Sequence, residues 1–187
     1  MTISVDGDFY RDGERLVKPF DPANVNPASL DLRLGNQIRV PDPVWKHLNE
    51  DALRCLIQSG AINHIPQWTP AFTFESHWLM PGDFVLCHSL EHTTLSADEI
   101  GLLFLKSSAG RIGLEHSHAG FGDPSFAGQW TWELSNIAPW PVELKPGVRL
   151  MQIVVIKLVD APGKGYDLVG SFQGQTGPTT VEQRKQR

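Results

Sequence analysis

The chain has 187 residues, of which 41% are hydrophobic and 20% charged, and its formal net charge is −5. This length predicts one well-cored domain spanning residues 1–187. The acidic balance argues against a nucleic-acid partner, although it allows a local basic pocket for a phosphorylated small molecule. No run approaches the roughly 20 apolar residues of a membrane helix, so no membrane partner is expected.

Two cysteines, Cys55 and Cys87, occur in the chain, and they form no CxxC motif. Two free thiols are typical of a protein in a reducing compartment. The first residues contain no apolar core of signal-peptide length. We therefore expect a cytoplasmic protein.

The first third of the chain contains one strong helix candidate. Residues 1–28 are polar, and the prolines within 19–28 oppose a helix, so an irregular N-terminal segment is expected. Residues 29–40 alternate apolar and polar side chains and predict a half-buried strand. Residues 44–60 follow Pro43 and stop at Gly60, which predicts one helix or two short turns. No other segment competes strongly as a helix.

From residue 70 the pattern is strand and turn. Strands are predicted over 72–78, 84–95 and 128–136, with two more in 141–159 around a Lys-Pro-Gly turn. Residues 96–108 predict a helical turn capped by Ser96, followed by a buried strand. Residues 161–187 lack core periodicity and predict a mobile tail, or an arm over a ligand or a neighbouring subunit. Many short strands with little helix favour a β-sandwich, jelly roll or barrel.

The stretch GQWTWELSN, residues 128–136, places an acid among indoles. Because side chains alternate along a strand, Trp130 and Trp132 share one face while Thr131 and Glu133 share the other. Glu133 is then either a solvated surface acid or a carboxylate held in a pocket to move protons.

Metal and hydrolase motifs are weak. His116 and His118 would share one face of a strand, but a zinc site normally needs further ligands, and the deaminase signature HxE with PCxxC is absent. Neither Ser107 nor Ser108 lies in GxSxG, and no P-loop occurs. We therefore expect no zinc and no protein-held metal.

Three clusters carry more information. Residues 105–114, LKSSAGRIGL, combine hydroxyls, cations and glycine amides as a phosphate cradle would, the alternative being a polar turn at a strand end. Residues 118–134 contain three glycines, which allow close backbone approach, and place Asp123 in a turn before Glu133. Residues 146–154 put Arg149 and Gln152 on an otherwise apolar strand pair.

Taken together, these clusters resemble the dCTP deaminase branch of the trimeric dUTPase superfamily. Five motifs carry the resemblance in order, from about Gly13 to Thr180: residues 19–36, 105–114, 116–136, 141–154 and 172–179. The resemblance implies a mainly β, distorted jelly-roll or β-barrel core with a few short helices and a C-terminal arm. It also implies a homotrimer with active sites between subunits, and Mg²⁺ that accompanies a triphosphate, without zinc.

The implied reaction is hydrolytic deamination of dCTP to dUTP and ammonia. Glu133 matches the family carboxylate, which acts as general base toward water and then as general acid toward ammonia. Ser107 matches the serine that positions the water, and Arg111 the arginine that stabilises developing negative charge. The remaining matched positions, which would bind substrate, are Lys106, Ser108, His118, Ala119, Asp123, Phe126, Gln152, Tyr166 and Gln175.

The sequence also departs from the family pattern near the pocket. His118 replaces a usual threonine, Gly122 an aliphatic residue, and Trp130 and Trp132 stand where smaller aliphatic residues are common. His118 is then a loop residue without a functional role, a residue that tunes substrate choice, or a metal ligand. Three alternative functions stay open: a bifunctional enzyme that forms dUMP and pyrophosphate, a dUTPase, and a non-enzymatic regulatory trimer that binds nucleotide.

Overall fold

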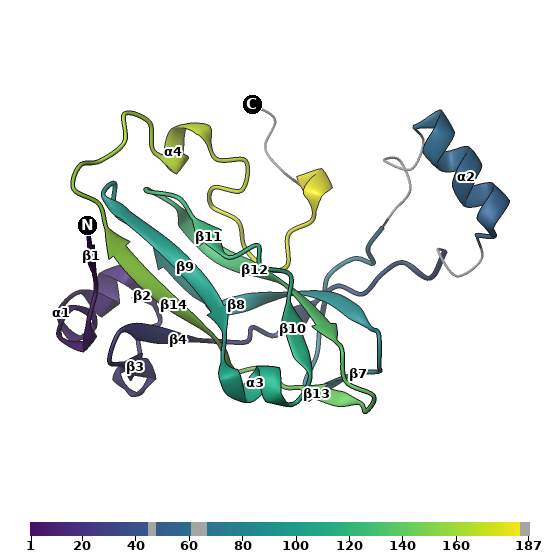
Figure 1. The fold of residues 1–187 in the computed structure, drawn as a ribbon, viewed down its shortest axis with the longest axis horizontal. Helices are drawn as coiled ribbons and strands as arrows, with labels where there is room; N and C mark the ends of the chain where they lie inside the picture. The colour runs from purple at the N-terminus through teal and green to yellow at the C-terminus, as the bar shows by residue number, and fades with distance from the viewer. Residues whose placement is uncertain (45–47, 61–66, 184–187) are drawn as a thin grey trace.

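Two facing β-sheets form the body of the protein (Figure 1). The computed structural model describes residues 1–44, 48–60 and 67–183. The larger sheet has the strand order β11-β9-β14-β4-β3, with β1 beside β14. Its strands are β1 (Thr2–Ile3), β3 (Val25–Asn26), β4 (Ser29–Arg33), β9 (Glu99–Leu105), β11 (Phe121–Gly122) and β14 (Arg149–Lys157).

The second sheet has the order β10-β12-β8-β2, and two smaller pairs flank it. Its strands are β2 (Val17–Lys18), β8 (Phe84–Thr94), β10 (Leu114–His116) and β12 (Ala127–Asn136). The small pairs join β5 (Gln37–Ile38) to β6 (Phe72–Thr73), and β7 (His77–Leu79) to β13 (Val142–Leu144). A mainly β fold is confirmed, and within the described ranges the sheets do not close into a barrel.

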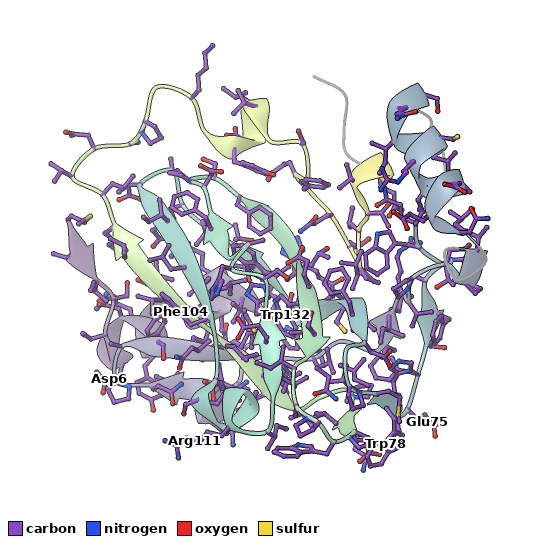
Figure 2. The ribbon with its side chains drawn as sticks, turned by 45° about the vertical axis from the view of Figure 1, so that its right-hand side comes forward. Asp6, Glu75, Trp78, Phe104, Arg111 and Trp132 are labelled. Carbon is purple, nitrogen blue, oxygen red and sulfur yellow. The ribbon has the colours of Figure 1, made fainter. Side chains whose placement is uncertain are left out.

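The core lies between the two sheets. Trp132 and Leu134 of β12 and Met151 and Ile153 of β14 are all fully buried, and Trp132 lies in the interior in Figure 2. Burying each such side chain contributes about 1.5–3 kcal/mol. Residues of β12 alternate between buried and half-buried along the whole strand. The predicted two faces of this strand are therefore confirmed.

The strand predicted over 29–40 is interrupted and is not half-buried. It divides into β4 and β5, and Gly35 lies between them, where a Cβ would come within 2.1 Å of the His88 ring. Asp31, predicted on the polar face, is 2% exposed because Lys106 and Asn26 cover it from the side. The burial of an ion pair explains why alternation failed to predict this strand's exposure.

The irregular N-terminal segment was a wrong prediction. Helix α1 spans Asp6–Leu16, and a short 3₁₀ helix spans Pro22–Asn24. The buried face of α1 consists of Phe9, Gly13 and Leu16. A Cβ on Gly13 would lie 2.2 Å from the Phe20 ring, so a glycine occupies a position where apolar periodicity would require a side chain. Because Gly13 interrupts the apolar face, the sequence of residues 6–16 shows no helical period although the helix is packed.

The second helix is shorter than predicted. Helix α2 spans Glu50–Ser59; Asn49 accepts a hydrogen bond from the Ala52 amide at 2.8 Å, and Gly60 ends the helix at φ +70°. Within the predicted 44–60, residues 45–47 lie outside the described residues. None of the described helices is both long and apolar enough to cross a membrane.

The predicted helical turn at Ser96 is wrong, and a helix forms at the other end of that segment. The Ser96 amide donates to the Glu99 carboxylate at 2.9 Å, and the Glu99 amide donates back to the Ser96 carbonyl, which makes a turn that leads into β9. The polar residues after β9 form helix α3, Ser107–Arg111. The predicted strands over 84–95 and 128–136 and the two in 141–159 are confirmed as β8, β12, β13 and β14.

Candidate active site

A cavity of about 440 Å³ lies beside β12, beneath the C-terminal segment. Six of the predicted site residues line it: Glu133, Ala119, Asp123, Phe126, Tyr166 and Gln175. Other lining residues come from the loop before β6, from β8 and from the C-terminal segment; they include Trp68, Phe84, Leu86, Phe172, Thr179 and Thr180. The cavity therefore combines segments from distant parts of the sequence.

Glu133 is the acid in this cavity. It follows the fully buried Trp132 and, like Thr131, points to the cavity side of β12. Its side chain is 26% exposed, but Oε2 is buried and has no hydrogen-bond partner among the described residues. His116 Nε2, also buried and unpartnered among them, lies 3.5 Å from this oxygen. An unpaired buried carboxylate oxygen is costly, which marks this position as a candidate for function.

The expectation that His116 and His118 share one strand face is wrong. Strand β10 ends at His116, and His118 adopts a positive φ of 58° in the following loop. The imidazole of His116 is 4% exposed, whereas that of His118 is 92% exposed and lies 3.4 Å from Glu115. The reversal of the chain after β10 therefore sends the two rings in different directions.

Aromatic rings form one wall of the cavity. The Phe126 ring lies 4.6 Å from the ring of Trp130 and 5.7 Å from that of Tyr166. Trp130 donates from Nε1 to Thr93 Oγ1 at 2.8 Å, which fixes the plane of its indole. These rings offer flat apolar surface of the kind on which a planar heterocycle stacks.

The C-terminal segment behaves as an arm that lies on its own chain. Helix α4 (Tyr166–Val169) begins it and a 3₁₀ helix (Val181–Gln183) ends its described part. The Gln129 amide donates to the Gln175 carbonyl at 2.9 Å, and the Thr179 amide donates to Thr131 Oγ1 at 3.0 Å. The arm thus occupies the stretch of β12 that β10, paired only with residues 134–136, leaves free.

The other predicted residues lie away from this cavity. Ser107, Ser108 and Arg111 are exposed on α3, at the opposite end of β9 from the loop that carries α4 (Figure 1). Figure 2 shows Arg111 at that edge of the molecule. Lys106 Nζ lies 2.5 Å from the buried Asp31 carboxylate. Gln152 faces Asp31 across β14 and β4. The predicted residues other than His118 therefore form two groups within one chain.

Sequence reasoning missed several residues of the cavity. Thr131 shares the Glu133 face of β12, so alternation was a signal that could have found it. His116 was weighed only as a metal ligand, although its place on β10 sets it beside Glu133. Trp68 lies in a segment without periodicity, so no sequence pattern pointed to it. Phe172 lies in the motif at 172–179, but it was not chosen as a site residue.

Comparisons with known proteins identify the family. A family model described as dCTP deaminase-like matches residues 8–158. A dUMP-forming dCTP deaminase of Mycobacterium avium is 41% identical over 172 residues, covering 87% of this chain and 84% of that protein. A dUMP-forming dCTP deaminase of Corynebacterium diphtheriae is 39% identical over 176 residues, covering 89% of this chain and 88% of that one.

A solved structure shares the fold. The 2'-deoxycytidine 5'-triphosphate deaminase of Agrobacterium tumefaciens superposes with a TM-score of 0.61 at 24% identity. The match covers 82% of this chain and 48% of that one, so this chain spans about half the length of that protein. The predicted family of deaminase enzymes is confirmed: the chain belongs to the dCTP deaminase-like family.

Proposed function

We propose that this chain deaminates dCTP, with Glu133 as the proton-transferring residue. The observation that carries the proposal is the buried Oε2 of Glu133, which has no hydrogen-bond partner among the described residues and lies in a cavity walled by aromatic rings. The names of the relatives from Mycobacterium avium and Corynebacterium diphtheriae support dCTP as the substrate. A surface acid would not need such an environment, so the pocket interpretation of Glu133 is favoured over the solvated one.

The chemistry needs one carboxylate that accepts and returns protons. Water adds across the C4–N3 bond of cytosine: its hydroxyl bonds to C4, and one proton passes through Glu133 to N3. The proton of the new C4 hydroxyl then passes through Glu133 to the exocyclic amino group. The bond between C4 and the amino nitrogen breaks, ammonia departs, and C4 becomes a carbonyl. His116 Nε2 lies 3.5 Å from Oε2, and we propose that this imidazole positions the carboxylate for both transfers.

We propose that a neighbouring subunit completes the site. The outer face of the larger sheet is apolar: Phe104 and Phe121 are 48% and 58% exposed, beside the half-buried Leu102 and Val154. Such a face is typical of a subunit interface. Because β9 carries this face and leads directly into α3, burial of the face in a homotrimer would bring Ser107, Ser108 and Arg111 to a neighbour's cavity.

In that assembly Arg111 would stabilise the negative charge that develops on the base, and Ser107 would position the water. The exposed Ser108, with Lys106 and Gln152, would contact the triphosphate, and Mg²⁺ would arrive bound to that triphosphate. Asp123 lines the cavity wall with Phe126 and Tyr166 and would contact the sugar. The contribution of His118 and a cytoplasmic location stay predictions.

A second step is favoured by the relatives, whose names describe dUMP formation. We propose that the final products are dUMP, pyrophosphate and ammonia. A second water would attack the α-phosphorus, the bond from that phosphorus to the bridging oxygen would break, and pyrophosphate would leave.

Product analysis tests both steps. Purified protein is incubated with dCTP and, separately, with dUTP, and nucleotides, pyrophosphate and ammonia are quantified. We expect ammonia and dUMP from dCTP. Accumulation of dUTP would remove the second step alone, whereas release of no ammonia from dCTP would refute the deaminase proposal. The same assay is run on Glu133→Gln, and its matched control is Glu50→Gln, which changes an exposed acid on α2.

A further inference from the structure

Arg39 connects the strand pair that carries the catalytic acid to two segments of the cavity wall. It directly follows β5, and its backbone exchanges two hydrogen bonds with Leu86 of β8, at 2.9 and 3.0 Å. Leu86 in turn pairs with Glu133 across β8 and β12. The backbone of Arg39 is therefore fixed to the same sheet as Glu133, although Arg39 itself does not line the cavity.

The guanidinium of Arg39 binds three oxygens outside that sheet. Nε donates to the Pro178 carbonyl at 2.7 Å, and Nη1 donates to the Thr69 carbonyl at 2.9 Å. Nη2 donates to Gln183 Oε1 at 3.3 Å, and that oxygen also accepts from the Thr180 amide at 2.9 Å. All three acceptors are neutral, so the guanidinium acts here as a rigid fork rather than as half of an ion pair.

These contacts lie immediately beside residues that shape the cavity. Thr69 follows Trp68, whose ring packs against Phe84 at a centroid distance of 5.3 Å. Pro178 precedes Thr179 and Thr180, which line the cavity on the arm. One half-buried side chain therefore joins two wall segments that are far apart in the sequence.

We propose that Arg39 is a positioning residue that holds the end of the arm and the loop at 67–69 together as one preformed wall of the nucleotide pocket. The inference rests on the proposed function, because it assigns this wall to dCTP. Holding the wall in place before binding lowers the conformational cost of capturing the nucleotide. When the preformed wall is populated only part of the time, the apparent affinity falls by the same fraction.

The rest of the arm has independent attachments, so loss of Arg39 is expected to act locally. The amide of Gly177 donates to Gln129 Oε1 at 2.8 Å, and the Gly174 amide donates to the Ala127 carbonyl at 2.7 Å. These contacts keep the first part of the arm on β12. Some bonds also remain in the segments that Arg39 joins, because the Thr179 amide donates to Thr131 Oγ1 and the Thr69 amide donates to the Val40 carbonyl, both at 3.0 Å. Replacement of Arg39 should therefore loosen residues 178–183 and 67–69 without detaching them, and leave the fold intact.

The test compares Arg39→Met and Arg39→Lys with Arg54→Met, an exposed arginine on α2 that pairs only with Glu50 among the described ion pairs. Steady-state deamination of dCTP gives KM and kcat, and hydrogen exchange reports on the amides of Thr69, Thr179 and Thr180. For Arg39→Met we expect KM to rise about tenfold with kcat changed by less than about twofold. Arg39→Lys, which keeps the charge but lacks the fork, should give an intermediate KM.

Exchange should accelerate together at Thr69 and at Thr179–Thr180 in Arg39→Met, and not in Arg54→Met. The inference is overturned if KM matches that of the Arg54→Met control, if kcat falls in place of a rise in KM, or if exchange accelerates throughout the chain. If the wild-type protein releases no ammonia, calorimetric binding of dCTP replaces KM. Failure of the proposed function is then distinguished from failure of this inference.

Discussion

Two departures from the family pattern, Gly122 and Trp130, are in contact: the Trp130 indole fills the volume beside Gly122. A Cβ added to Gly122 would lie 2.3 Å from the end of the Trp130 indole and 3.1 Å from Leu95. Trp130 is 5% exposed and packs on Phe126 in the cavity wall. The large indole therefore fills the volume that a side chain at 122 would take, and we predict that the two positions are energetically coupled.

The coupling can be estimated from the contacts. Trp130→Leu removes most of a buried indole, at a cost of about 3 kcal/mol in the free energy of unfolding. It also removes the hydrogen bond to Thr93, which adds about 1 kcal/mol. Gly122→Ala overpacks the same space and costs about 1–3 kcal/mol. In the double variant the new methyl group enters the vacated volume, so the combined cost should fall short of the sum by about 1–3 kcal/mol.

Urea unfolding of the four proteins at one protein concentration measures this double-mutant cycle. Dependence of the midpoint on concentration is checked with the wild type, because an oligomer couples stability to assembly. Additive costs within about 0.5 kcal/mol, or a cost for Gly122→Ala alone below about 0.5 kcal/mol, would refute the reasoning. Either result would mean that the backbone at 122 moves away from the indole.

Three further predictions concern pH, the partner of the acid, and assembly. Burial lowers the pKa of His88 below its usual 6.5, and its Nε2 accepts from the Gln37 amide, so the folded state binds fewer protons than the unfolded chain. The free energy of unfolding should therefore fall as the pH drops below 6.5. In His88→Gln the urea midpoint should change less between about pH 7.5 and 5.5 than in the wild type, and an equal change in both proteins would contradict this. His116→Gln should lower kcat for deamination about tenfold or more while dCTP binding measured by calorimetry persists, and an unchanged kcat would show that the imidazole does not position Glu133. An equal mixture of Arg111→Ala and Glu133→Gln subunits, unfolded and refolded together, should regain about a quarter of wild-type activity if each site joins two subunits, whereas no recovery would place both residues in one subunit.

Much of the fold was readable from period-two alternation. Strand β12 follows it along its whole length, because one face packs against the opposing sheet. Strand β14 follows it over most of its length, whereas β8 has five consecutive buried residues before it alternates. The same rule failed for Asp31, whose burial depends on Lys106 arriving from a distant part of the chain. Helix α1 was missed for a different reason: residues 1–28 are polar, and Gly13 stands in the buried face where the Phe20 ring packs, so no apolar helical period is visible.

The site was only partly predictable for a related reason. Alternation placed Glu133 on the face opposite the indoles, and the structure adds the cavity and His116 beside it. The arm was one of two predictions for residues 161–187, and the structure places part of it in the cavity wall, whereas only tertiary contacts bring Trp68 there. Helix α3 lies far from that cavity, which is consistent with the active site between subunits that the family resemblance implies. Gly122 and Trp130 looked like separate departures until the structure showed them in contact.

The central claim is that the Glu133 carboxylate transfers protons in the pocket. Wild type, Glu133→Gln and the control Glu50→Gln are compared in one experiment that follows ammonia release from dCTP and, on the same samples, dCTP binding by calorimetry. We predict that Glu133→Gln still binds dCTP but loses at least about 10³-fold in ammonia release, because an amide cannot accept the proton of water. Ammonia release by Glu133→Gln at the rate of the Glu50→Gln control would contradict the account.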